Sequence, residues 1–336
     1  MCHFLRGVRN FKYQKSTSPA RMEWYTTLME LFFFAAGIGL LYKCSDILVE
    51  GTSKVALRMG VSSLIISLTI VAYGTSAPEF ATSALASYKA HSSLSLGNVL
   101  GSCLANLLLV LGISAVMRPI SVNLGIVKRE LPILLVSTIL LLLLSIRGNL
   151  DMLSGLVMLC AFALYLIFFI RMAKKERERK VKFIGNNRNG MLKYVLFIIF
   201  GLIGVVVGAQ LLVDSAVYFA NIFGVPEFLI AISMIAVGTS LPELAVSATA
   251  SLKGESDISL GNLIGSNVFN ILLILGVCSC ISAIHIDLKS ILSELFLLAV
   301  TIAMFPIFYT KGRVSRAEGA LLLVVYAVYL VLLFYK

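Results

Sequence analysis

Charged residues are scarce in this chain of 336 residues. Asp, Glu, Lys and Arg together make up 13% of the sequence, whereas 59% is hydrophobic. Soluble domains carry about 25% charged residues, so this composition argues against a soluble domain. The apolar residues stand in long blocks, such as "LPILLVSTILLLLLSI" and "ALLLVVYAVYLVLLF". Because roughly 20 apolar residues cross a bilayer as a helix, these blocks predict an all-α polytopic membrane protein.

The chain also lacks recognisable motifs built on histidine or cysteine, and it lacks a nucleotide-binding motif. The histidines, His3, His91 and His285, lie in a tail or near span ends, which leaves an intramembrane serine protease without a buried base. No "GxxxxGK[ST]" motif is present, which argues against an ATP-driven pump. The cysteines have no zinc-finger spacing and are expected to be free thiols: Cys2, Cys44, Cys103, Cys160, Cys278 and Cys280. We therefore expect neither enzymatic activity nor a cofactor.

The net charge of +11 does not indicate a nucleic-acid partner, because the basic residues cluster at the ends of apolar blocks. Counting Lys and Arg on alternate sides of the membrane gives 18 on one side and nine on the other. The positive-inside rule then predicts a cytoplasmic loop at 172–193, with both termini outside the cell membrane. Membrane lipid is the expected surrounding, and no obligate protein partner is evident.

The segment 1–27 is expected to be an N-terminal tail. Residues 1–21 are basic, contain no acidic residue, and are too polar for a signal peptide. A targeting tail, an external extension and a mis-assigned start all fit this pattern. We favour Met22 as the true first residue.

The hydropathy pattern predicts ten spans. Their ranges are 28–49, 61–88, 93–117, 131–147, 150–171, 194–217, 225–251, 257–283, 289–309 and 316–335. Two of them, 61–88 and 225–251, carry Gly, Thr, Ser, Pro and Glu in their middles. Such interruptions predict broken helices.

The chain contains an internal repeat. Residues 69–112 align without a gap to residues 233–276 at an offset of 164, with 24 identities in 44 positions. The predicted domains are a first repeat at 28–171 and a second at 194–336. Each repeat holds five spans, and five is odd, so the second repeat enters the membrane with opposite polarity. Inverted repeats are typical of secondary transporters, whose binding sites form at the midplane where broken helices meet.

Two glutamates lie deep within the broken spans. A carboxylate at the bilayer centre costs at least ~2.5 kcal/mol, so Glu79 and Glu243 are expected to face a polar cavity or a cation. The proline before each one removes a helix hydrogen bond and frees carbonyl groups near 74–75 and 238–239. A carbonyl that is costly in lipid becomes a ligand beside a hard cation.

Helical spacing adds further oxygens beside the two acids. Residues four apart share a helix face, as do the pairs Thr75 and Glu79, Ser102 and Asn106, Thr239 and Glu243, and Ser266 and Asn270. An all-oxygen set suits Ca²⁺, which takes six to eight such ligands. Two ionised glutamates balance one Ca²⁺, and two or more Na⁺ could occupy the same oxygens, which suggests exchange. Small residues at helical spacing, Gly97, Gly101, Gly261 and Gly265, are expected to permit close helix packing.

The segments "GTSAPE" and "GTSLPE", each followed by "GNxxGS", resemble the two alpha-repeats of the sodium/calcium exchangers, within the calcium/cation antiporter superfamily. The short basic loop between the halves is similar to that of prokaryotic members without a large regulatory loop. The resemblance implies that Ca²⁺ binds at Glu79, Glu243, Thr75 and Thr239. It implies that Na⁺ binds at Ala72, Ser76, Ser102, Ala236, Ser240 and Ser266, together with the two threonines. It also implies that Asn106 and Asn270 border the central site, and that spans one and six slide to alternate access.

Several alternatives remain open. A proton/calcium antiporter is the nearest rival, although such relatives carry an acid in a "GNxxE" pattern that these segments lack. Some archaeal and potassium-dependent relatives have Asp where this chain has Asn270, so the neutral Asn106 and Asn270 argue against potassium co-transport. A cation channel would pass current without a counter-ion. We expect a Ca²⁺/Na⁺ antiporter, and the sequence leaves its stoichiometry and direction open.

Overall fold

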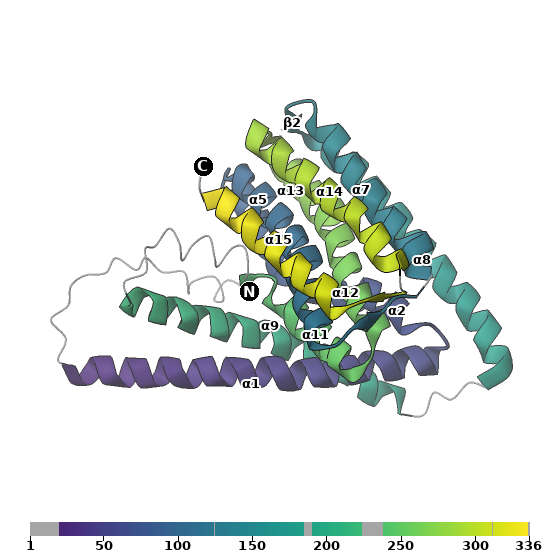
Figure 1. The fold of residues 1–336 in the computed structure, drawn as a ribbon, viewed down its shortest axis with the longest axis horizontal. Coiled ribbons are helices and arrows are strands. Elements are labelled where there is room, and N and C mark those ends of the chain that lie inside the picture. Colours follow the sequence, from purple (N-terminus) through teal and green to yellow (C-terminus); the bar gives the residue numbers. More distant parts are fainter. Residues whose placement is uncertain (1–19, 124, 185–189, 224–237, 311, 335–336) are drawn as a thin grey trace.

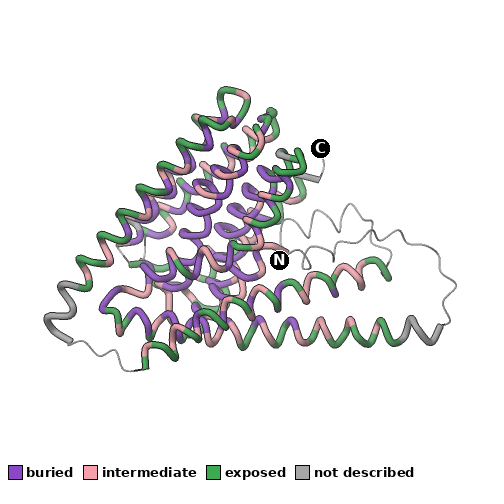
Figure 2. The backbone as a smooth tube through the Cα atoms, turned by 180° about the vertical axis from the view of Figure 1, so that it is seen from behind, coloured by how far each residue is buried: buried purple, intermediate pink, exposed green. Residues whose placement is uncertain are grey.

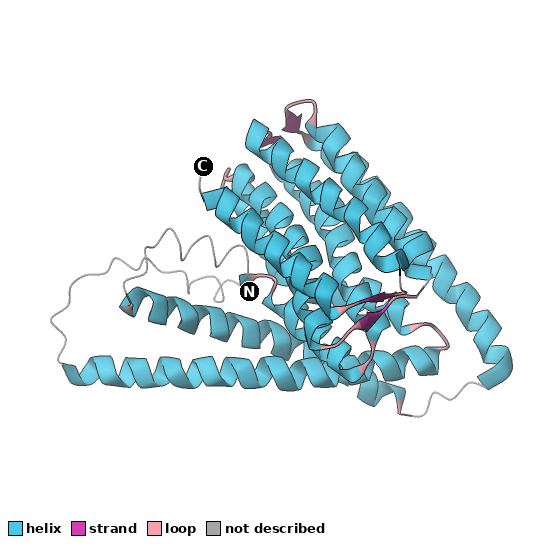
Figure 3. Ribbon diagram, in the orientation of Figure 1, coloured by secondary structure: helices cyan, strands magenta, loops and turns pink. Residues whose placement is uncertain are grey.

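The computed structural model describes residues 20–123, 125–184, 190–223, 238–310 and 312–334. These ranges are mostly helical, and Figure 3 shows the short strands at the ends of helices. Six of the described helices are long and apolar enough to cross a membrane, or up to seven if a bent pair forms one span. The prediction of an all-α polytopic membrane protein is confirmed, whereas the number of ten spans stays a prediction.

Two long helices, α1 (Ala20–Met59) and α9 (Met191–Ile222), lie side by side and extend away from the remaining bundle (Figure 1). Glycines allow their backbones to approach closely. A Cβ atom added at Gly37 would lie 2.9 Å from the carbonyl oxygen of Gly208 on the other helix. This close contact makes α1 and α9 a paired unit. An ion pair of 2.6 Å between Asp46 and Lys253 connects α1 to the bundle.

The expected break in the span 61–88 is present. This span consists of α2 (Ser63–Ile66), the π-helical segment η2 (Ser67–Val71), α3 (Ala72–Thr75) and α4 (Ala77–Tyr88). The chain bends by 49° between the part up to Thr75 and α4. Pro78 lies in the first turn of α4, where a missing N–H is tolerated. In the second repeat, α11 (Leu241–Lys253) begins with Pro242 in the same place, while residues 224–237 lie outside the described residues.

Two spans form the centre of the bundle. One consists of α5 (Ser92–Leu104), the π-helical segment η3 (Ala105–Val110) and α6 (Leu111–Met117). The other consists of α12 (Ser256–Phe269), the π-helical segment η6 (Asn270–Ile274) and α13 (Leu275–Ile281). In both spans, 78% of the most apolar stretch of 18 residues is buried, compared with 28% to 33% of that stretch in the other candidate spans. Their polar residues therefore face protein.

The glycines of the second "GNxxGS" segment make the expected close contact. A Cβ atom at Gly265 would lie 2.6 Å from the carbonyl oxygen of Leu68, so α12 packs directly on η2. Gly97 and Gly101 meet nothing within 4 Å among the residues the structure describes. The repeat equivalents of the η2 residues fall at 231–235, outside the described residues, so packing at Gly97 and Gly101 stays a prediction.

The outer elements are the π-helical segment η4 (Ile126–Glu130), α7 (Leu131–Ser145), α8 (Met152–Ile184), α14 (Leu288–Thr310) and α15 (Arg316–Phe334). Two antiparallel strand pairs join them: β1 (Ile120–Ser121) with β4 (Arg313–Val314), and β2 (Asn149–Leu150) with β3 (Ile284–His285). The offset of 164 converts β1 into β3 and β2 into β4. Each strand pair therefore links the two repeats in the same way.

The ends of two outer helices are capped by carboxylates outside the membrane spans. Asp287 precedes α14, and its carboxylate accepts bonds from the hydroxyl (2.6 Å) and the N–H (2.8 Å) of Ser290. These two bonds hold the pKa of Asp287 below its usual range. Asp151 and Ser154 make the same arrangement before α8, and there the N–H and hydroxyl of Ser154 lower the pKa of Asp151.

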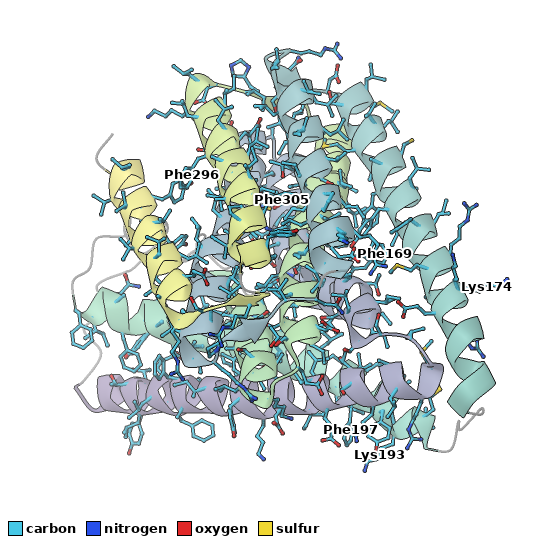
Figure 4. All side chains as sticks on the ribbon, turned by 45° about the vertical axis from the view of Figure 1, so that its right-hand side comes forward. Phe169, Lys174, Lys193, Phe197, Phe296 and Phe305 are labelled. Carbon is cyan, nitrogen blue, oxygen red and sulfur yellow. The ribbon has the colours of Figure 1, made fainter. Side chains whose placement is uncertain are left out.

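Burial follows the layout expected of a membrane protein. Figure 2 shows a buried bundle interior and exposed outer helix faces. Large apolar side chains such as Leu164 and Ile170 on α8 are each 68% exposed. Figure 4 shows side chains pointing outward from α8, with Lys174 toward the end of the helix. An apolar exterior of this extent suits contact with lipid.

Candidate functional site

The two acids occupy equivalent positions at the starts of two helices. Glu79 lies in the first turn of α4 and Glu243 in the first turn of α11, and both are 0% exposed. Helix N-termini stabilise negative charge, because their first N–H groups point toward it. None of the ion pairs between described residues includes either acid. The described part of the protein thus buries two carboxylates and gives neither of them a basic partner.

Hydroxyl groups hold one oxygen of each carboxylate. The Ser102 hydroxyl donates to Glu79 Oε1 at 3.2 Å. Two hydroxyls donate to Glu243 Oε1, from Ser76 at 2.7 Å and from Ser266 at 3.3 Å. The bond from Ser76 crosses from one repeat to the other. The acids are therefore fixed in orientation by residues of both repeats.

More contacts cross between the repeats. The hydroxyls of Ser102 and Ser240 lie 3.1 Å apart, and the Asn270 amide donates to Ser102 at 3.2 Å. The Ser266 hydroxyl donates to the Ala72 carbonyl at 3.4 Å. Side chains from α5, α12, η6 and the residue before α11 therefore meet the backbone of α3 in one buried cluster.

Four oxygens in or next to this cluster are buried and have no hydrogen-bond partner among the described residues: Glu79 Oε2, Glu243 Oε2, Asn106 Oδ1 and Asn270 Oδ1. An unsatisfied buried acceptor costs about 1–3 kcal/mol, and more when it is charged. Four such acceptors at repeat-equivalent positions are the type of oxygen that a hard cation binds, and Ca²⁺ takes six to eight of them. All of these candidate metal ligands are oxygens, so the residues fit Ca²⁺ or Na⁺ as a transported substrate.

The two threonines lie beside the acids. Thr75 is 0% exposed, and its hydroxyl lies 3.2 Å from the Ala72 carbonyl and 3.2 Å from Asn262 Oδ1. The hydroxyl of Thr75 also interacts with Glu243, and that of Thr239 with Glu79. Each threonine thus approaches the acid of the other repeat.

The residues expected from the sequence come together, apart from Ala236, which lies outside the described residues. The helices around the site also contain π-helical turns, since η3 begins at Ala105 and η6 at Asn270. Single π-helical turns are frequent at functional sites, where they redirect side chains and carbonyls. No pattern recognised in the sequence predicted these turns.

Sequence reasoning missed three buried asparagines next to the site, Asn98, Asn262 and Asn267. Asn262 donates to the Ser247 hydroxyl at 3.0 Å, and Asn98 donates in the same way to Ser83 at 2.9 Å. Asn98 and Asn262 belong to the two "GNxxGS" segments, so the repeat itself carried a signal for them. Asn267 aligns with Cys103 and gave no such signal.

These features define a multi-pass membrane transporter for cations. A family model described as "Sodium/calcium exchanger protein" matches residues 29–171 and 193–335. The chain therefore belongs to the sodium/calcium exchanger family and is of the prokaryotic type. Membership makes it a cation/Ca²⁺ antiporter.

Individual relatives agree with this assignment. The sodium/calcium exchanger MaX1 of Methanosarcina acetivorans is 32% identical in an alignment that covers 89% of this chain and 97% of MaX1. A protein of Alkalimonas amylolytica provisionally named antiporter CaxA is 36% identical, covering 91% of this chain and 99% of CaxA. A solved structure of the sodium-calcium exchanger NCX_Mj superposes with a TM-score of 0.80 at 32% identity, covering 91% of this chain and 99% of that one.

Proposed function

We propose that this protein exchanges Ca²⁺ for Na⁺ across the cell membrane by alternating access. The observation that carries the proposal is a set of four buried oxygens without a hydrogen-bond partner in the described part of the chain, two from each repeat, on Glu79, Glu243, Asn106 and Asn270. Two ionised carboxylates carry a charge of −2, which one Ca²⁺ neutralises. An empty site would leave that charge unbalanced in a low-dielectric interior, which disfavours crossing without an ion.

Calcium binds between the two acids in this proposal, with carbonyls of Thr75 and Thr239 as further ligands. Sodium ions use the surrounding oxygens of Ala72, Ser76, Ser102, Ala236, Ser240 and Ser266. Asn106 and Asn270 border the central position. The proposal is supported by the hydroxyls that already orient Glu79 and Glu243 from both repeats. Since both cations neutralise the charge of the same two acids, they compete, and competition couples their movements.

The proposed architecture has ten spans in two inverted repeats, 28–171 and 194–336, joined by a cytoplasmic loop at 172–193. The matching elements of the repeats support it. Adding 164 to the bounds of α6 gives the bounds of α13, and the strand pairs repeat in the same way. The paired helices α1 and α9 stand apart from the bundle, which suits them to slide along it.

Sodium is the proposed counter-ion rather than the proton. The position that follows "GN" by three residues is Gly101 in one repeat and Gly265 in the other, so neither repeat offers an acid there. The names of the relatives do not distinguish Na⁺ from H⁺ as the counter-ion. A direct flux measurement distinguishes them.

The test is uptake of radioactive calcium into proteoliposomes that contain the purified protein. The internal solution holds Na⁺, the external solution holds a non-transported cation, and pH is clamped on both sides. We expect uptake that depends on the Na⁺ gradient and continues when a protonophore is added. Uptake driven by a pH gradient alone would instead establish a proton antiporter, and current without a counter-ion would establish a channel.

A further inference from the structure

Asn267 and Cys103 occupy the same position in the two repeats, 164 residues apart, and they contact each other. The Asn267 amide donates to the Cys103 carbonyl at 3.3 Å, and the Cys103 thiol approaches the Asn267 carbonyl at 3.9 Å. Both side chains are 0% exposed. Each residue thus contacts the backbone of its own counterpart, beside the buried oxygens of the site.

Asn267 makes one contact that a cysteine cannot match. Its Oδ1 accepts a hydrogen bond from the Asn106 amide at 3.1 Å. Because Asn267 Nδ2 is already committed to the Cys103 carbonyl, only the oxygen of Asn267 is presented to Asn106. A flipped Asn106 amide would then place two oxygens against each other, which is repulsive. The contact therefore keeps Asn106 Oδ1 among the partnerless oxygens of the site.

The other central asparagine is held differently. The Asn270 amide donates to the Ser102 hydroxyl at 3.2 Å, and the Cys103 thiol lies beside it. That hydroxyl also donates to Glu79 at 3.2 Å. Ser102 is one of the expected ligands, and these rearrange when a cation binds. The support of Asn270 thus changes with occupancy, whereas the amide that holds Asn106 is not itself an expected ligand.

We propose that Asn267 is a positioning residue, which acts through Asn106 by fixing its amide with the oxygen toward the cation. This inference rests on the proposed function for the identity of the ion. An oxygen that is already oriented binds Ca²⁺ without first having to reorganise, which raises affinity. The two repeats are therefore inequivalent, with a preset oxygen at Asn106 and an adaptable one at Asn270.

The test compares Asn267→Cys with the wild type by equilibrium binding of radioactive calcium to the purified full chain in detergent. This substitution installs the residue that the first repeat already has at this position. We expect the Kd for Ca²⁺ to rise roughly 5- to 10-fold, as for loss of one buried hydrogen bond, while the maximal exchange rate stays within about 2-fold. An unchanged Kd would overturn the proposal.

Two further variants separate positioning from general damage. In an Asn106→Ala background, Asn267→Cys should have no additional effect on the Kd, because the residue through which it acts is gone. A full additional effect would show that Asn267 acts by another route. Asn267→Asp keeps an acceptor for the Asn106 amide, and in its protonated form it also keeps a donor for the Cys103 carbonyl, so it should not weaken binding. If it weakens binding as much as Asn267→Cys, the proposal is wrong.

The same material distinguishes the two levels of inference. Wild-type protein that binds Ca²⁺ but shows no Na⁺-driven uptake would refute the proposed function, and the binding data would still decide the role of Asn267. Wild-type exchange combined with an unchanged Kd in Asn267→Cys would refute only the positioning role. If the wild type does not bind Ca²⁺, both the proposed function and the positioning role of Asn267 are refuted.

Discussion

Replacing Glu243 by glutamine is the most informative single substitution in the site. The side chain is 0% exposed and accepts two hydroxyl bonds, at 2.7 Å and 3.3 Å, through Oε1. Glutamine has nearly the same shape and keeps a carbonyl oxygen, so the volume of the site is preserved. The substitution removes one negative charge, and the charge of the site with Ca²⁺ bound changes from zero to +1.

The size of the effect follows from the burial of this acid. Two unit charges about 4 Å apart interact by about 4 kcal/mol at an effective dielectric constant near 20, and a divalent ion doubles this to about 8 kcal/mol. Every 1.4 kcal/mol is roughly a factor of ten in affinity. The amide oxygen and a less costly empty site recover part of the loss. We therefore expect Ca²⁺ affinity to fall by at least ~10³-fold.

The assay is Na⁺-dependent calcium uptake into proteoliposomes, with Glu294→Gln as the matched control. Glu294 is also a fully buried glutamate of the second repeat, but its carboxylate accepts from Ser145, away from the site. We expect Glu243→Gln to lose uptake and Glu294→Gln to keep it. Near-normal uptake by Glu243→Gln would refute the reasoning, and so would equal losses in the two variants at equal folded yield.

Three further predictions test other parts of the structure. Ser76→Ala removes the 2.7 Å bond to Glu243 and should raise the KM for Ca²⁺ by roughly 10- to 100-fold, in steady-state uptake. Gly265→Val should lower the thermal unfolding midpoint strongly, because its Cβ would lie 2.6 Å from the Leu68 carbonyl oxygen; a midpoint equal to that of the wild type would contradict this contact. The lowered pKa of Asp287 means that its stabilising bonds are present above about pH 4 and are lost as pH falls through the folded-state value. The unfolding midpoints of the wild type and Asp287→Ala should therefore differ at pH 7 and converge in acid.

The sequence predicted the centre of the site because the repeat displays it twice. Glu79 and Glu243 stand out as acids in apolar spans, and the prolines before them mark the helix breaks. One such acid could be a structural accident, but two at equivalent positions restrict the interpretation to a shared polar cluster. Spacing along a helix then identified Ser102 and Ser266, which the structure brings to the carboxylates.

The rest required three-dimensional information. The contact between Asn106 and Asn267 joins two helices that are far apart in sequence, and no local pattern specifies which amide faces which. The role of position 267 was also hidden because its counterpart is Cys103, so the repeat offered no identity there. The bond from Ser76 to Glu243 likewise depends on how the repeats interlock. Helix spacing constrains residues within one element, and it leaves contacts between elements undetermined.

Crystals grown with a heavier calcium surrogate would reveal, through anomalous scattering, whether one acid from each repeat binds the same ion. We expect that both acids do so, with one strong peak between the carboxylates of Glu79 and Glu243 and an oxygen from each within about 2.6 Å of the ion. A peak that contacts only one of these acids, or a peak elsewhere with both carboxylates unliganded, would contradict it.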